Sequence, residues 1–417
     1  MTMGDDALTT REASTAPVGA PNRAPGDDTE EEMPRAGLSR SRMVAVALFF
    51  AFAIGFLYFV LPRLAGLRET WNRIDSGEPG WLAVAAGFEV LSFGGYIVLF
   101  RTVFVRGSSR IDWRESYQIT MAGLAATRLL AAGGAGGVAL TAWALKRSGM
   151  DGHTVTRRMT AFLVILYGVY MGALLVDGAG LATGLWGVHA PAAVTIAPAA
   201  FGGIVIASAL LMSRLRPVSV APSDGRVGRI RLKLRHITLS IAAGVRGALG
   251  LARSREVGLL GAFAWWGFDI AVLWASFHAF GAVPPISVII MGYFVGTLAN
   301  TLPLPGGIGG VEGGMVGALV AFGVDPGLAV LAVLAYRGFA FWLPIVPGAI
   351  AFFTLRRTVV GWEAEDAARA AVASVSWKAS ASSTILSSRS GYRTWPSRCR
   401  VSSRSPGLTM PSSSPST

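Results

Sequence analysis

The sequence predicts an all-α polytopic membrane protein with about six spanning helices and two glycine-broken re-entrant hairpins in an inverted repeat. Of its 417 residues, 52% are hydrophobic and 15% are charged, whereas soluble domains average about 25% charged residues. The apolar residues gather in long segments, and the basic residues gather between those segments. The single cysteine, Cys399, argues against a disulfide framework and against a cysteine-ligated zinc site.

The apolar segments define the expected elements, because a spanning helix needs about 20 mainly apolar residues. Six segments meet this requirement: 43–61, 80–100, 159–176, 193–212, 257–280 and 327–354. We expect the last to be one kinked helix, since it contains Pro344 and Pro347. Two further apolar stretches, 117–147 and 286–323, are interrupted by glycine clusters, and each half is too short to span comfortably. These stretches predict re-entrant hairpins or broken helices.

Both ends of the chain differ in composition from the transmembrane domain predicted for residues 43–357. Residues 1–42 are rich in Ala, Pro, Gly and acidic residues, and residues 358–417 are rich in Ser and Arg. Such segments bury too little apolar surface to offset the entropy lost on ordering. We therefore expect two disordered tails.

The basic residues predict the orientation of the chain. Of the 23 Lys and Arg residues between positions 43 and 354, 18 fall in three loops, 101–116, 146–158 and 213–256. Because basic loops face the cytoplasm, we expect a multi-pass protein of the cell membrane with these loops and both termini on the cytoplasmic side. The formal charge of +13 thus fits a membrane, and no nucleic-acid partner is expected.

An internal repeat links the two broken stretches. Residues 133–138 (GGAGGV) match residues 306–311 (GGIGGV) at a constant offset of 173 positions. The helix before each motif carries an acid, Glu89 in the first half and Asp269 in the second, and these two helices should run antiparallel. Transporters commonly use inverted repeats whose helix breaks mark the substrate site. The alternative is that the recurring glycines serve only close helix packing.

Each break is a candidate anion site, because a half-helix that starts there presents free backbone N–H groups at the positive end of its dipole. Five ionisable residues lie at membrane depth, where charges should be paired or line water: Glu89, Arg128, Asp269, Glu312 and Arg337. We expect Arg128 and Arg337 to neutralise a lipid phosphate. We expect Glu89 and Asp269 to be structural partners of other side chains and not ligands. Glu312 would pair with an arginine, receive a cationic head group or carry a proton.

The predicted head-group site combines these charges with the glycines of the two breaks. Its members are Arg128, Gly133, Gly134, Asn300, Gly306, Gly307, Gly309, Gly310, Glu312 and Arg337. The glycine clusters do not have the spacing of a dinucleotide-binding or phosphate-loop motif, and the histidines are dispersed. We expect no catalytic residue, metal or cofactor.

Residues 300–314, which read NTLPLPGGIGGVEGG and precede an apolar helix and Tyr336-Arg337, resemble the transmembrane region of lysylphosphatidylglycerol synthase/flippase proteins and their stand-alone relatives of unassigned function. Residues 126–149 resemble the family's earlier segment, with its basic end at 146–149 (KRSG), although 129–132 (LLAA) replaces the expected proline.

The resemblance implies a division of labour between two regions. In full-length members, a soluble C-terminal domain attaches an amino acid to phosphatidylglycerol from aminoacyl-tRNA, and the membrane region moves the product between leaflets. About 60 residues follow the last predicted helix here, fewer than a catalytic domain of about 100–150 residues needs. We therefore expect the flippase-like activity and not the synthase activity.

Three functions compete at this point. The leading one is a flippase-like translocase, or a handler, of an anionic phospholipid or lipid-linked phosphate. The second is a membrane transferase acting on polyprenyl-phosphate-linked sugars, which needs an interfacial carboxylate or metal site, whereas Asp112, Glu115 and Asp151 are isolated. The third is a non-catalytic membrane partner that stabilises another protein. As partners of this chain, a second copy of itself or a membrane enzyme also stays open.

Overall fold

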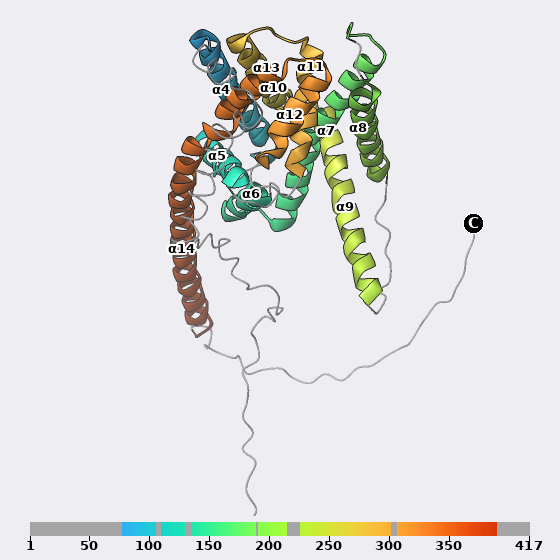
Figure 1. The fold of residues 1–417 in the computed structure, drawn as a ribbon. Coiled ribbons are helices and arrows are strands. Elements are labelled where there is room, and N and C mark those ends of the chain that lie inside the picture. The colour runs from blue at the N-terminus through green and yellow to red at the C-terminus, as the bar shows by residue number, and fades with distance from the viewer. Residues whose placement is uncertain are drawn as a thin grey trace, which may run out of the picture. The chain divides into compact units, whose positions relative to one another are not determined.

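A computed structural model describes residues 77–105, 110–129, 135–188, 191–214, 226–301 and 307–389. The predicted span 43–61, the tail 1–42 and residues 390–417 lie outside these ranges. Every regular element in the described ranges is helical (Figure 1). Five helical stretches there are long and apolar enough to cross a membrane: α4 (Pro79–Phe104), α7 (Gly152–Ala182), α8 (Ala192–Ser213), α10 (Leu260–Phe280) with the preceding turn Val257–Leu259, and Pro326–Trp377. The predicted polytopic all-α fold is confirmed.

The helices α4 and α10 pack against each other and run antiparallel. The Glu78 N–H before α4 donates to the carbonyl of Ala279 near the end of α10 at 2.9 Å. Further along α4, Gly95 meets the start of α10, where a Cβ added to Gly261 would lie 2.4 Å from the Gly95 carbonyl oxygen. Small residues thus let the two backbones approach closely. The first helices of the two halves therefore point in opposite directions, as the sequence predicts.

Each broken stretch forms a helical hairpin. The first consists of α5 (Trp113–Leu129) and α6 (Ala135–Arg147). The second consists of α11 (Ile286–Thr297), a 3-10 turn (Leu298–Thr301) and α12 (Gly310–Ala321). These four helices have 17, 13, 12 and 12 residues, fewer than the roughly 20 that a spanning helix needs. The halves of each hairpin therefore depend on one another and on their neighbours for burial.

The two hairpins pack in the same register. In the first, a Cβ on Gly123 would lie 3.0 Å from Oγ1 of Thr141, and in the second, a Cβ on Gly314 would lie 3.1 Å from Cα of Gly296. The second pair occupies positions 173 residues after the first. The repeat therefore describes equivalent three-dimensional contacts and not only a recurrent glycine motif.

Replacing Gly296 with alanine should force α11 away from α12. The added Cβ would lie 2.7 Å from the backbone nitrogen of Met315, and overpacking of this kind costs about 1–3 kcal/mol. Gly313→Ala is the matched control, because a Cβ at that position of α12 meets nothing within 4 Å. Thermal unfolding of the two purified variants in detergent checks the prediction, and equal unfolding temperatures would contradict it.

Helices α7, α8 and α9 (Arg226–Arg253) pack beside the two halves. Gly178 of α7 lies against Thr195 of α8, and Gly244 of α9 lies against Thr160 of α7. The basic segment predicted between two spans is therefore largely helical. Val245 of α9 is buried in this contact, so the second half of α9 packs on protein.

The predicted kink in the last span is a π-helical turn. Helix α13 (Pro326–Arg337) runs into the turn Gly338–Trp342, and α14 (Ile345–Arg389) follows. The N–H of Leu343 donates to the carbonyl of Gly338 at 3.0 Å, five residues earlier. Pro344 has no N–H, so the carbonyl of Ala340 receives no bond from the residue four positions later. A buried backbone acceptor is thereby released for another donor.

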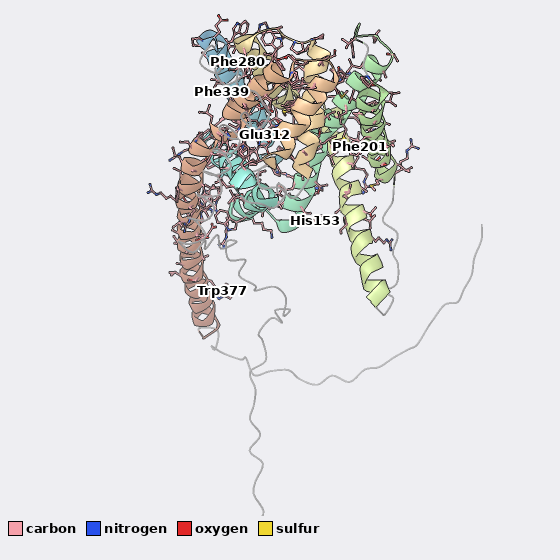
Figure 2. The ribbon with its side chains drawn as sticks, viewed as in Figure 1. His153, Phe201, Phe280, Glu312, Phe339 and Trp377 are labelled. Atoms are coloured by element: carbon pink, nitrogen blue, oxygen red, sulfur yellow. The ribbon has the colours of Figure 1, made fainter. Side chains whose placement is uncertain are left out.

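Residues 358–389, for which the sequence predicts a disordered tail, instead continue α14. The stretch 363–373 is rich in Ala, which favours helix, and Arg369 pairs with Glu365 one turn earlier. Arg147 at the end of α6 also binds Glu363 at 2.6 Å. Trp377 lies on the exposed part of this helix (Figure 2).

Candidate functional site

A cavity of about 380 Å³ lies where the two hairpins meet the α4–α10 pair. The end of the first hairpin contributes Thr127, Arg128 and Gly137 to its wall, and the second contributes Asn300 and Gly307. The broken ends of both repeats therefore border one space. This is the arrangement expected of an inverted repeat whose breaks form a binding site.

The polar wall of the cavity is centred on Asp269 of α10. Tyr336 of α13 donates its hydroxyl hydrogen to Oδ2 of Asp269 at 2.9 Å, and Tyr293 of α11 donates to the same oxygen. All three side chains are buried. Hydrogen bonds to a carboxylate favour its charged form, and three helices converge where the two tyrosines supply such bonds to this acid.

Glu89 of α4 lies beside this group and is almost completely buried, with 1% of its surface exposed. It interacts electrostatically with Asp269 and Arg128. Among the residues that the structure describes, no donor reaches either carboxyl oxygen of Glu89. Glu89 and Asp269 thus lie together, in keeping with the structural role that the sequence predicts for each. The two acids differ in the number of hydrogen-bond donors that reach them.

Arg128, at the end of α5, connects the first hairpin with the second half of the protein. Its Nη2 donates to the carbonyl of Ala340 at 2.7 Å, which is the acceptor released by Pro344. Its Nη1 is shielded from solvent and has no hydrogen-bond partner within the described ranges. A guanidinium that lines a cavity with an unused donor is a candidate anion ligand.

Arg337 and Glu312 form a buried ion pair. The Nε of Arg337 donates to Oε1 of Glu312 at 2.6 Å, and the two side chains are 6% and 4% exposed. The guanidinium also lies over the ring of Phe341, 4.3 Å from its centroid. Glu312 lies inside the helical body (Figure 2). Its carboxylate satisfies Arg337, and the pair carries no net charge.

Glu312 also binds the start of its own helix. Its Oε2 accepts the N–H of Gly309 at 2.7 Å, and Gly309 has φ +83°, a conformation that favours glycine. A negative charge already lies at the positive end of α12, where the sequence predicts an anion site. The chain itself therefore supplies an anion to this helix end.

The structure divides the predicted site residues into three groups. Four of them line the cavity: Arg128, Asn300, Gly307 and Arg337. Three of them, Gly309, Gly310 and Glu312, lie at the start of α12 and not on the cavity wall. The remaining three, Gly133, Gly134 and Gly306, fall outside the described residues.

Sequence reasoning missed the aromatic part of the site. Tyr293 and Tyr336 hold the acid, and Tyr170 lines the cavity while its hydroxyl donates to the carbonyl of Phe294 at 2.6 Å. Trp265 and Trp266 line another part of the wall. One feature of the sequence indicates this part of the site. Tyr336 directly precedes Arg337, so two polar groups lie together in an otherwise apolar helix.

The fold and the site define a polytopic, all-helical membrane protein built around a polar cavity between two broken hairpins. The chain belongs to the family described as Lysylphosphatidylglycerol synthase TM region, which it matches over residues 43–348. It is also similar to a UPF0104 membrane protein of Methanothermobacter thermautotrophicus, with 31% identity over 118 residues. That similarity covers 26% of this chain and 35% of the relative. The family expected from residues 300–314 is confirmed.

Proposed function

We propose that this chain moves an anionic phospholipid, or a lipid-linked phosphate, between membrane leaflets without changing it chemically. The observation that carries the proposal is Arg128, which lines a cavity bordered by both hairpin ends and whose Nη1 has no hydrogen-bond partner among the described residues. A guanidinium matches the geometry of a phosphate group. Membership of a family named for a lysylphosphatidylglycerol synthase supports a lipid as the ligand.

The two kinds of cavity wall suit an amphiphile. The polar wall offers Arg128 and the Asp269–tyrosine cluster to a head group, and the aromatic wall offers apolar ring faces. Tyr167 of α7 lines the cavity and is also exposed at the protein surface. A ligand could therefore keep its acyl chains in the bilayer while its head group enters from the side. A lipid gradient, protons or the membrane potential would supply the energy.

A leaflet-resolved assay tests this function. The full chain is reconstituted in phosphatidylcholine vesicles that contain phosphatidylglycerol with a fluorophore on one acyl chain, and an impermeant reductant then bleaches the outer leaflet. We expect bleaching to continue past the plateau of protein-free vesicles, with chemically unchanged lipid recovered afterwards. The same fluorophore on phosphatidylcholine measures selectivity for anionic head groups. A plateau equal to that of protein-free vesicles would overturn the proposal, and a converted lipid would indicate a transferase.

We also propose that both termini and the loops 101–116 and 213–256 face the cytoplasm. A Cys399→Ser background allows single cysteines to be placed on either side, Ser219→Cys in the basic segment and Ser76→Cys before the second predicted span. An impermeant thiol reagent should label Ser76→Cys in intact cells and label Ser219→Cys only after permeabilisation. Labelling of Ser219→Cys in intact cells would contradict this orientation.

A further inference from the structure

We propose that Glu89 and Asp269 form a proton-binding site, and that a proton there and an anion at Arg128 bind cooperatively. The second part rests on the proposed function, because it takes Arg128 as the anion ligand. The first part stands on the two acids alone. The observation that carries it is a buried pair of carboxyl groups. Asp269 accepts hydrogen bonds from two tyrosine hydroxyls, whereas Glu89 accepts none from the residues that the structure describes.

The pair lies where α4 and α10 cross. One turn from each acid, the Ser92 hydroxyl of α4 donates to the carbonyl of Trp265 in α10 at 2.9 Å, so the two backbones are fixed close together here. Glu89 is 1% exposed and Asp269 is 7% exposed. Neither acid can separate from the other without opening this helix contact, and both are held away from bulk water.

The titratable groups that face Glu89 come from three other helices. They are Asp269 on α10, Arg128 on α5 and Tyr336 on α13. Helix α7 contributes Tyr167 to the cavity that Asp269 and Arg128 line, while its Arg158 binds the Phe104 carbonyl at the far end of α4. Asp269 receives both tyrosine hydroxyls, so it is the acid arranged to remain charged.

Glu89 is the acid arranged to hold the proton. A buried carboxylate without a donor is very costly, and such a group takes up a proton instead. When Glu89 is protonated, its O–H can donate to Asp269, and one negative charge then faces the one positive charge of Arg128. On release, the O–H bond of Glu89 breaks, the electron pair stays on its carboxylate, and the proton passes by way of Asp269, which lines the cavity, to water.

Proton release changes what Arg128 can bind. A second carboxylate beside the guanidinium competes with a bound anion for its positive charge and repels that anion directly. The proton and the anion therefore favour each other's binding, and the coupling is reciprocal. In a transport cycle, a proton would accompany the anionic head group, so a pH gradient would bias the direction of movement.

The proton is measured by infrared spectroscopy of the full chain in phosphatidylcholine nanodiscs. We expect a carbonyl band of a protonated carboxylic acid at neutral pH that disappears in Glu89→Gln. Asp177→Asn is the matched control, because Asp177 is a buried acid on α7 with one oxygen that also lacks a partner in the described part of the chain. The Glu89 band should persist in this control. An unchanged spectrum in folded Glu89→Gln would overturn the proton site.

The coupling is measured by the binding of a short-chain phosphatidylglycerol across a pH series. Affinity of the wild-type protein should fall as the pH rises, by at most about tenfold per pH unit, which is the limit for one linked proton. Glu89→Gln should bind this lipid with an affinity that no longer depends on pH. The wild-type series alone decides the coupling if that variant does not fold.

The two proposals fail in different ways. If phosphatidylglycerol binds equally well at every pH and the carboxylic band is absent, the proton inference is overturned while the lipid function stands. If the band is present and lost in Glu89→Gln but phosphatidylglycerol binds at no pH, the proton site is supported, and the coupling and the proposed anion site are overturned together.

Discussion

Replacing Glu312 with glutamine should lower the free energy of unfolding by about 3–5 kcal/mol, because it leaves a buried guanidinium without its charged partner. The carboxylate of Glu312 accepts from Arg337 at 2.6 Å and from the Gly309 N–H at 2.7 Å. A neutral amide keeps the size of the side chain but removes the charge that balances Arg337. Urea or thermal unfolding in a mild detergent measures the loss.

The double variant separates a structural role of this ion pair from a role in lipid binding. Arg337→Gln alone should destabilise the protein to a similar extent, and Arg337→Gln with Glu312→Gln should recover much of the loss, since no buried charge is then left unbalanced. If the double variant regains stability and also moves lipid, the pair is structural. If it regains stability but does not move lipid, Arg337 acts on the ligand. Wild-type stability in either single variant would contradict the prediction.

The helices and hairpins follow from signals that are local in the sequence. Apolar length predicts the spans, and the glycine clusters predict where 117–147 and 286–323 turn back, because these features report burial and backbone freedom directly. The two spans predicted at 159–176 and 193–212 lie between the helices that carry Glu89 and Asp269. These two crossings, together with the hairpin, predict that the first helices of the two halves run antiparallel.

The contacts within the site depend on how the helices pack against one another, and no local feature of the sequence specifies that packing. The sequence predicts that Arg128 and Arg337 together neutralise one lipid phosphate. The structure instead pairs Arg337 with Glu312 and leaves one donor of Arg128 without a partner among the described residues. The Ala340 carbonyl that holds Arg128 is available because Pro344 has no N–H. The sequence predicts this kink only as a bend in the helix. The kink also provides the backbone acceptor that binds Arg128, which lies 212 residues away in the chain.

For the acids Glu89 and Asp269 as well, the sequence predicts a structural role but not the hydrogen-bond partners. Glu89 and Asp269 are expected as structural partners on account of their depth in the membrane, and the structure places them together. Depth alone does not reveal that Tyr293 and Tyr336 both donate to Asp269, because those tyrosines lie on two other helices. The distinction between the charged acid and the proton-holding acid thus depends on packing that only the folded chain creates.

Replacing Arg128 with lysine should slow phosphatidylglycerol movement about tenfold or more, although the positive charge is kept. The Nη2 of Arg128 donates to the Ala340 carbonyl at 2.7 Å, while Nη1 has no partner in the described part of the chain and is the donor that we assign to the ligand. One planar fork can bind both groups at once, whereas the single ammonium of lysine must choose between them. A hydrogen bond to a charged group contributes about 1.5–3 kcal/mol, which corresponds to this loss.

Arg128→Gln should be more severe, because it also removes the charge that balances the Glu89–Asp269 pair, and selectivity over phosphatidylcholine should disappear with it. Arg147→Lys is the matched control, since Arg147 forms an exposed ion pair with Glu363 and does not line the cavity. The vesicle assay measures movement of both lipids, and the unfolding temperature establishes that each variant is folded. Full movement of phosphatidylglycerol by folded Arg128→Gln would remove this residue from the mechanism.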